Sequence, residues 1–403
     1  MTGLTAAGID RLRDAMGARV RERQMPGIVA LLASGDDVNV DAIGTLAFDD
    51  ERPMRRDTLF RITSMTKPIM AATTMMLIED GLITLDEPVE RLLPELADRR
   101  VLRRVDGPLD DTVPASRSIT IEDLLTFRLG FGHVTEPTFN PPYPIVTVPG
   151  DLGIMLGPPD PRTPHTPDEW MARFGSLPLM EQPGERWRYN VGTMLLGVLV
   201  ARAADTSLST VLNDRLFTPL GMVDTGFTTT PNDAERMPPH YMSNGGDGEP
   251  VRQPHSMPDE WTREPAFPDG SAGLLSTVDD YHAFATMLRR GGTHNGQRLL
   301  TVESIAAMTT NHLTPDQLRS AGVLLDGQGW GYGMAVVTTA TDAGLTPGQY
   351  GWSGGYGSTW FNDPDRDLTA IALTQTSDFL WNGGLAEFDA LAVGAVAADG
   401  KAP

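Results

Sequence analysis

One serine and one lysine stand at a spacing that suits nucleophilic catalysis. Ser64 and Lys67 are three residues apart at the start of segment 64–80, which lacks glycine and is followed by Gly81, a helix stop signal. On a helix this spacing places the ammonium group one turn from the hydroxyl and on the same face. A serine hydroxyl needs an adjacent base, which a lysine becomes when burial lowers its pKa. The pair therefore indicates a serine nucleophile activated by a lysine.

Lysine is rare in this chain, which makes its position informative. Of 32 basic residues only Lys67 and Lys401 are lysines, and arginine cannot act as a base because its pKa is above about 12. Segment 60–63 before Ser64 has the pattern of a strand that leads into the helix. The N–H groups of a helix start stabilise a developing oxyanion. The alternative is that Lys67 is an accidental surface lysine, and the rarity of lysine in this chain disfavours that interpretation.

Both ends of the chain have the pattern of strands, with helices between them. A helix at 4–23 and two apolar strands joined by a turn at 35–37 begin the chain, and strand patterns at 330–337, 351–361 and 368–373 precede a last helix at 385–397. We therefore expect an α+β fold whose antiparallel sheet is built from both termini and flanked by helices. The predicted lobes are a discontinuous sheet lobe, 1–62 with 280–403, and an inserted, mostly helical lobe, 63–279.

A proline-rich segment, residues 131–167, lies inside the predicted helical lobe. It also holds apolar side chains, among them Phe139 and Tyr143, which a plain linker would not need. We expect an ordered loop that covers a cleft, with these two residues in the substrate pocket. The alternative is a loop that only covers core.

Charge and composition exclude several classes of function. Acidic residues outnumber basic ones 53 to 32, and the net charge of −21 repels nucleic acid and anionic membrane surfaces, so neither is an expected partner. The chain has no cysteine, and its seven histidines form no metal-ligand pattern, so no metal and no cofactor are expected. The N-terminal residues lack a signal-peptide pattern and no apolar run approaches 18 residues, which predicts a cytoplasmic protein.

Segment 60–68 resembles the nucleophile motif of the serine β-lactamase and penicillin-binding protein superfamily, and most of all its class C-like esterases, the family VIII carboxylesterases. Further family-like stretches follow in the family's order at 119–126, 183–190, 216–222, 273–277 and 331–333. The resemblance implies a β-lactamase-like fold and acyl transfer through a covalent serine ester.

The family's second motif is a tyrosine followed two residues later by asparagine. Tyr189 fits the tyrosine by position, just before an apolar helix, but Val191 stands where the family has asparagine. The resemblance thus implies that Tyr189 joins Ser64 and Lys67 in the catalytic group. The change at Val191 disfavours binding of a β-lactam side-chain amide.

The third family motif, K-T-G or H-x-G on the strand beside the serine, corresponds here to Trp352-Ser353-Gly354-Gly355. Tryptophan replaces the cation that attracts a substrate carboxylate, so a neutral ester loses no partner while an anionic β-lactam does. By this resemblance Trp352, Ser353 and Gly354 line the pocket. The backbone N–H groups of Ser64 and Gly355 form the oxyanion hole.

Ser353 also lies in a G-x-S-x-G pattern, residues 351–355, which is typical of the nucleophile of α/β-hydrolases. That motif requires a helix after the serine. Here a second strand pattern and the turn 363–367 follow, which indicates a hairpin. We therefore expect Ser64, and not Ser353, to be the nucleophile.

The predicted function is hydrolysis of short-chain carboxylic esters, small-molecule substrates, through an acyl-enzyme on Ser64. Two alternatives stay open: a β-lactamase or D-amino-acid peptidase or transferase of the same superfamily, and a catalytically silent binding protein on this fold. The sequence leaves undecided whether Lys67 or Tyr189 is the base, because strongly coupled groups titrate as a unit. It also gives no oligomeric state.

Overall fold

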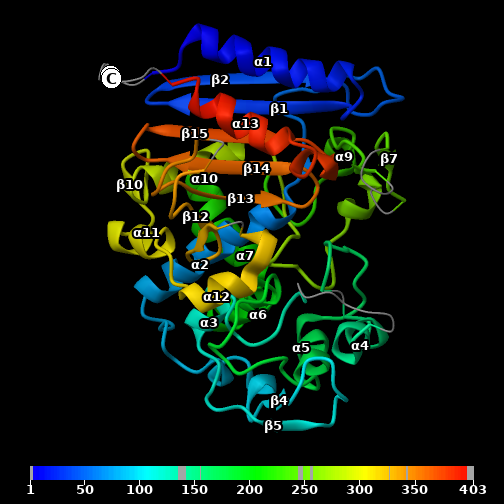
Figure 1. Ribbon diagram of the computed structural model, residues 1–403, viewed down its shortest axis with the longest axis vertical. Coiled ribbons are helices and arrows are strands. Elements are labelled where there is room, and N and C mark those ends of the chain that lie inside the picture. The colour runs from blue at the N-terminus through cyan, green and yellow to red at the C-terminus, as the bar shows by residue number, and fades with distance from the viewer. Residues whose placement is uncertain are drawn as a thin grey trace.

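A seven-stranded antiparallel sheet joins the two ends of the chain (Figure 1). The structure is a computed structural model that describes residues 3–134, 142–154, 156–243, 248–254, 257–325, 327–341 and 344–396. The sheet order is β11-β12-β13-β14-β15-β1-β2. Its strands are β1 (Gly27–Ser34), β2 (Asp37–Gly44), β11 (Gly329–Trp330), β12 (Ala335–Val336), β13 (Tyr350–Gly354), β14 (Ser358–Asp363) and β15 (Leu368–Leu373).

The N-terminal strand β1 pairs with the C-terminal strand β15, with Leu31 opposite Ile371. This pairing confirms the predicted sheet from both termini. Successive β1 side chains point to opposite faces, so Leu31 enters the larger core cluster and Leu32 the smaller one. Because both faces of β1 are covered, the strand reads as a continuous apolar run and not as an alternating one.

Helices cover both faces of this sheet. Helices α1 (Ala6–Arg21) and α13 (Gly384–Val393) pack on the smaller core cluster, and α2 (Thr66–Glu79) and α10 (Val278–Arg289) pack on the larger one. Figure 1 shows α13 in front of the sheet and α1 along its upper edge. The other helices are α3 (Ile121–Leu125), α4 (Pro144–Asp151), α5 (Pro167–Gly175), α6 (Val191–Ala203), α7 (Leu208–Leu212), α8 (Thr218–Leu220), α9 (Pro231–Ala234), α11 (Val302–Met308) and α12 (Pro315–Ala321).

In the parts of the chain that the structure describes, four two-stranded sheets lie outside the main sheet. They are β3 (Phe60–Arg61) with β8 (Leu275–Ser276), β4 (Arg100–Leu102) with β5 (Thr112–Pro114), β6 (Tyr241–Met242) with β7 (Val251–Arg252), and β9 (Thr293–His294) with β10 (Gln297–Arg298). The part of the proline-rich segment that was expected to be loop contains the helix α4. Pro144 stands at its first turn, where a missing N–H costs nothing. The division into two lobes stays a prediction.

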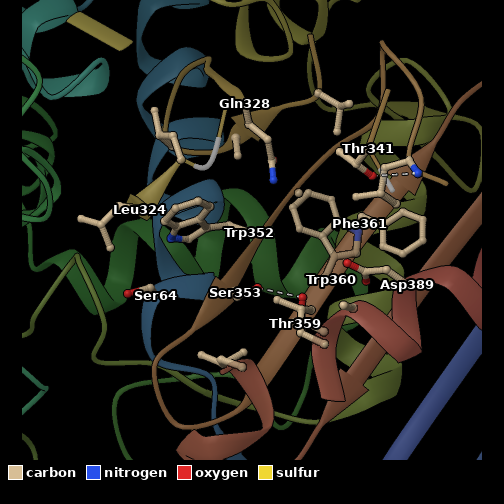
Figure 2. Close-up of a pocket in the computed structure, with 18 of the residues that line it drawn as sticks. Ser64, Leu324, Gln328, Thr341, Trp352, Ser353, Thr359, Trp360, Phe361 and Asp389 are labelled. Atoms are coloured by element: carbon tan, nitrogen blue, oxygen red, sulfur yellow. Dashed lines mark hydrogen bonds between the residues drawn. The ribbon is translucent and has the colours of Figure 1, made fainter. Parts of the chain in front are cut away.

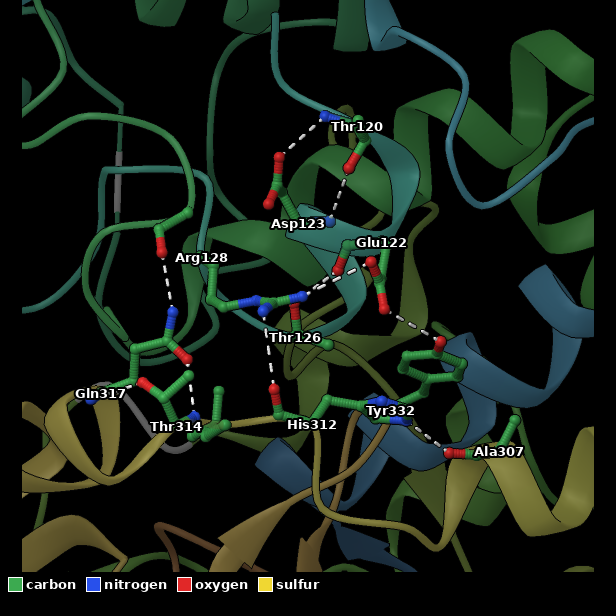
Figure 3. A network of polar contacts seen from close by, with 12 residues as sticks. Thr120, Glu122, Asp123, Thr126, Arg128, Ala307, His312, Thr314, Gln317 and Tyr332 are labelled. Atoms are coloured by element: carbon green, nitrogen blue, oxygen red, sulfur yellow. Dashed lines mark hydrogen bonds and ion pairs between the residues drawn. The ribbon is translucent and has the colours of Figure 1, made fainter. Parts of the chain in front are cut away.

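A polar network ties α3 to the segment before and after β11 (Figure 3). Thr120 and Asp123 form a reciprocal capping box at the start of α3. In the same first turn, Glu122 pairs with Arg128 and accepts a hydrogen bond from Tyr332, whose ring stacks on His312. These contacts fix the Tyr332 turn against the helical region.

Strand β13 reaches the nucleophile segment through Gly354. A Cβ atom added to Gly354 would lie 2.2 Å from the Ile62 carbonyl oxygen and 2.4 Å from Thr63 Oγ1. The backbone of β13 at Gly354 therefore packs directly on the backbone of Ile62, two residues before Ser64. A Cβ atom added to the next residue, Gly355, would have no heavy atom within 4 Å.

These two neighbouring glycines give a matched test of the packing. Gly354→Ala should lower the free energy of unfolding by about 1–3 kcal/mol, the usual cost of overpacking, whereas Gly355→Ala should change it by less than about 0.5 kcal/mol. Urea titration of both variants measures the difference. Equal stabilities would mean that β13 does not hold the nucleophile segment in place.

Candidate active site

Ser64 lies in a turn that links a short strand to a long helix. Strand β3 ends at Arg61, a 3₁₀ turn covers Thr63–Met65, and α2 begins at Thr66. The strand-to-helix junction predicted from the sequence is therefore confirmed. Thr63 has a φ angle of +43°, a left-handed conformation that a β-branched residue rarely adopts. Such backbone strain costs about 1–3 kcal/mol and clusters at functional sites.

The Lys67 side chain is completely buried, with 0% of its surface exposed. Its Nζ atom donates hydrogen bonds to Ser64 Oγ at 2.9 Å and to the Ser271 carbonyl oxygen at 2.9 Å. Burial lowers the pKa of this amine to about 7, although the nearby Asp269 carboxylate acts in the opposite direction. The amine is thus partly neutral at neutral pH, which is the state a general base requires.

Tyr189, which stands two residues before α6, approaches the same serine. Its hydroxyl shares a hydrogen bond with Ser64, and its ring centroid lies 4.6 Å from Lys67 Nζ. Burial raises the pKa of the phenol to about 12. The next residue, Asn190, has a φ angle of +86° and anchors its side chain on the Leu156 carbonyl oxygen at 2.9 Å. This strained and anchored residue fixes where the tyrosine points.

An aromatic cluster surrounds the Tyr189 ring. Trp352 Nε1 donates a hydrogen bond to the Tyr189 hydroxyl at 2.8 Å. Trp187 stacks on the tyrosine ring at a centroid distance of 5.7 Å, while Phe127 and Trp330 meet it edge-on. Rigid aromatic neighbours leave the phenol little freedom to move. The hydroxyl therefore stays between Ser64 and the indole of Trp352.

A cavity of about 550 Å³ opens beside Ser64 (Figure 2). Of the residues predicted for the site, Ser64, Tyr189, Trp352, Ser353 and Gly355 line it. The wall is mostly apolar and comes from β13, β14, α13 and the segment after α12. Such a cavity accepts an apolar small molecule whose reacting group meets the polar residues at one end.

The other predicted site residues lie elsewhere. Gly354 is buried against Ile62 and is not among the described residues that line the cavity. Tyr143 starts α4 and packs, partly buried, on the larger core cluster, so it is not in that lining either. Phe139 lies outside the described residues. Ser353 lines the cavity, but its hydroxyl is paired with Thr359 at 2.9 Å on the neighbouring strand of a hairpin.

Two groups that act on the Lys67 amine were not predicted from the sequence. The Ser271 carbonyl, which accepts its hydrogen bond, and the partly buried Asp269, whose charge raises its pKa, come from a loop just before β8. This loop reaches Lys67 because β8 pairs with β3, directly before the nucleophile. Behind Lys67, a Cβ on Gly333, whose φ is +73°, would lie 2.8 Å from the Lys67 carbonyl oxygen. The Asp-Gly-Ser-Ala-Gly run at 269–273 is the signal that marks the loop.

Within the described parts of the chain, no group of three or more His, Asp or Glu side chains is placed to hold a metal ion. No single described helix is long and apolar enough to span a membrane. Helices Val191–Ala203 and Leu208–Leu220 reach that length and composition only as a pair bent by 84°.

The buried amine predicts an unusual titration. The lysine Cε signal that disappears in Lys67→Arg should titrate near pH 7 in the folded protein, because burial disfavours the charged form. Carbon NMR of protein labelled only at lysine resolves it easily, since the chain has two lysines. The unfolded state binds more protons between about pH 7 and the ordinary lysine pKa of 10.5. The free energy of unfolding should therefore rise with pH in this window. A signal that titrates near 10.5 would show that the amine is fully charged.

Comparison with known proteins shows the family to which the chain belongs. The Beta-lactamase family profile matches residues 12–393. Protein Rv1367c of Mycobacterium tuberculosis (strain ATCC 25618 / H37Rv) is 37% identical over 351 residues, 84% of this chain and 82% of that protein. Esterase EstB of Burkholderia gladioli is 30% identical over 400 residues, 92% of this chain and 91% of EstB.

A solved structure has the same arrangement of sheet and helices. EstCE1, described as a hydrolase with promiscuous acyltransferase activity, aligns with a TM-score of 0.80 and 25% sequence identity, covering 96% of this chain and 98% of EstCE1. The α+β fold expected from the sequence is therefore β-lactamase-like. Because the family profile matches nearly the whole chain and EstB is 30% identical over 92% of it, the chain belongs to the Beta-lactamase family.

Proposed function

We propose that this protein is a serine hydrolase that cleaves short-chain carboxylic esters through an acyl-enzyme on Ser64. One observation carries the proposal: Ser64 is hydrogen-bonded to a buried lysine and to a tyrosine at the end of an apolar cavity. A nucleophile within reach of a base, with that base held by further groups, is the pattern of covalent catalysis. Similarity to EstB and EstCE1 supports ester chemistry.

In the acylation step Ser64 Oγ attacks the ester carbonyl and its proton passes to the Lys67 amine, 2.9 Å away. The lowered pKa of Lys67 and the raised pKa of Tyr189 favour the amine as the acceptor. Backbone N–H groups of Ser64 and Gly355 stabilise the oxyanion. When the carbonyl re-forms, the bond to the alcohol oxygen breaks. The proton returns to this leaving alkoxide through Lys67 and Tyr189, which leaves Lys67 neutral.

Deacylation repeats the same steps with water. A water molecule gives a proton to the Lys67 and Tyr189 pair and attacks the acyl carbonyl, and the Ser64 oxygen leaves with that proton. The products are a carboxylic acid and the regenerated serine. No cofactor enters either step.

Trp352 supports neutral esters over anionic β-lactams. Its indole N–H donates a hydrogen bond to the Tyr189 hydroxyl. A cationic side chain at this position would also face the substrate carboxylate. An indole supplies the hydrogen bond without the charge. Loss of one charged hydrogen bond costs about 1.5–3 kcal/mol, or about 10- to 150-fold in selectivity.

Acyl transfer to an alcohol is a second candidate. The observation that favours it is the similarity to EstCE1, whose description includes promiscuous acyltransferase activity. The chemistry differs only in the second step, where an alcohol replaces water. The apolar cavity beside Ser64 would hold such an alcohol near the acyl group.

The two serines of the cavity provide a direct test of the nucleophile. Ser64→Ala should abolish hydrolysis of p-nitrophenyl acetate, whereas Ser353→Ala should keep most of it, because Ser353 only pairs with Thr359. Mass spectrometry after treatment with a sulfonyl fluoride or phosphonate probe should locate the label on Ser64. A label on Ser353 instead would overturn the mechanism and the choice of nucleophile.

Substrate selectivity tests the role of Trp352. The kcat/KM for a short-chain p-nitrophenyl ester should exceed that for a chromogenic cephalosporin by about 100-fold or more, and Trp352→Lys should narrow the gap. Trp352→Phe is the matched control, because it removes the indole N–H and adds no charge. Equal efficiency of the wild-type protein on both substrates would favour the β-lactamase alternative.

A further inference from the structure

The cavity beside Ser64 has a second polar feature at its far end. Asp389, on α13, lines the cavity and is only 9% exposed. Figure 2 shows its side chain beside Phe361 and Trp360, well away from Ser64 across the cavity. Among the described residues that line the cavity, Asp389 is the only acidic or basic one.

The Asp389 carboxyl group has no partner among the residues that the structure describes. Its Oδ1 atom is buried without a hydrogen bond, and burial raises the pKa of the group to about 7. Two other polar side chains of the cavity wall are engaged elsewhere: Ser353 with Thr359, and Gln349 with Asp363. Burial of a carboxyl group without a hydrogen-bond partner lowers the stability of a protein. A role in binding substrate is a physical reason to keep such a group.

Apolar side chains form much of the cavity wall near this carboxyl. Leu385 and Ala386 stand one turn before Asp389 on α13, and both line the cavity together with Phe361 of β14. At the cavity edge Trp381 is 73% exposed and Val323 is 85% exposed. Both side chains extend the apolar wall to the mouth of the cavity. The cavity thus fits an elongated apolar group with a polar tip.

We propose that the alcohol part of the ester extends along this cavity and ends in a hydrogen-bond donor, a hydroxyl or an amino group, that binds the Asp389 carboxyl. The inference rests on the proposed function, which places a short acyl group at Ser64. The substrates are then short-chain esters of diols or amino alcohols with an apolar spacer. A carboxyl group accepts a hydrogen bond from either tip, and the carboxylate form binds an ammonium group most strongly.

Three series of acetate esters test the subsite: those of alkanols, of alkanediols with one free hydroxyl, and of amino alcohols, each with increasing chain length. At the length that reaches Asp389, the donor-ended esters should have a kcat/KM about tenfold or more above the methyl-ended ester of equal length. Asp389→Leu should remove both preferences. Asp389→Asn, which keeps an acceptor but not the charge, should keep the preference for hydroxyl and lose that for ammonium.

Glu387→Gln is the matched control, because it removes a carboxylate from the solvent side of the same helix, where Glu387 pairs with Arg19. It should leave all three series unchanged. Thermal unfolding separates recognition from a structural role. Removal of an unpartnered buried carboxyl in Asp389→Leu should raise the melting temperature, whereas loss of a structural partner would lower it.

Several outcomes would overturn the subsite. They are equal kcat/KM for donor-ended and methyl-ended acetates at every length, a preference that survives in Asp389→Leu, or a lower melting temperature for that variant. A matching series of methyl esters with hydroxyl- or amino-ended acyl chains checks which part of the ester extends. A preference confined to this acyl series would overturn the placement of the alcohol part.

A binding measurement keeps this inference separate from the proposed function. Calorimetry with the free amino alcohol of the best length, on Ser64→Ala with and without Asp389→Leu, should show binding that depends on Asp389. If no ester is cleaved but this binding is seen, the proposed function fails and the subsite stands. If esters are cleaved and no such binding is seen, the subsite fails.

Discussion

The exclusion of water from Lys67 is the constraint on which this active site depends. Two effects act on its amine: burial lowers its pKa, and the nearby Asp269 carboxylate raises it. Burial is the larger, because the side chain is completely enclosed and its direct polar contacts are Ser64 and the backbone of Ser271. A carboxylate in direct contact would hold the amine protonated and unable to accept the serine proton.

The tryptophan beside Tyr189 complements this arrangement. An indole N–H donates to the phenol oxygen but carries no positive charge, so it stabilises a phenolate less than an ammonium group in the same place. The pKa of Tyr189 accordingly stays well above neutral. Tyr189 is thus suited to donate a hydrogen bond, while Lys67 is suited to accept a proton. In the proposed mechanism, the tryptophan at position 352 of β13 therefore bears both on which substrates bind and on how the proton moves.

The sheet serves as the common support for these groups. Strand β13 brings Trp352 and Gly355 beside the turn that carries Ser64, and the close contact of Gly354 with Ile62 sets their separation. The same strands and α13 enclose the far end of the cavity, where Asp389 remains without a partner. Strain at the nucleophile turn and a desolvated carboxyl both reduce stability, and both lie where substrate is proposed to bind.

The sequence by itself determined the elements and the central chemical pair. The three-residue spacing of Ser64 and Lys67 places both groups on one helix turn, and the strand pattern after Ser353 indicated a hairpin; the structure has both. Such features depend on neighbours along the chain, so local periodicity is enough to find them. The family resemblance added Tyr189 and Trp352 by position.

Only the tertiary structure decided what surrounds that pair. The Ser271 carbonyl meets Lys67 because β3 pairs with β8, more than 200 residues away in the sequence. Tyr143, expected in the pocket from its apolar character, packs on the core instead, and Asp389 gave no sequence signal at all. A side chain's partners and its access to water are set by contacts between distant segments, and no local pattern encodes those contacts.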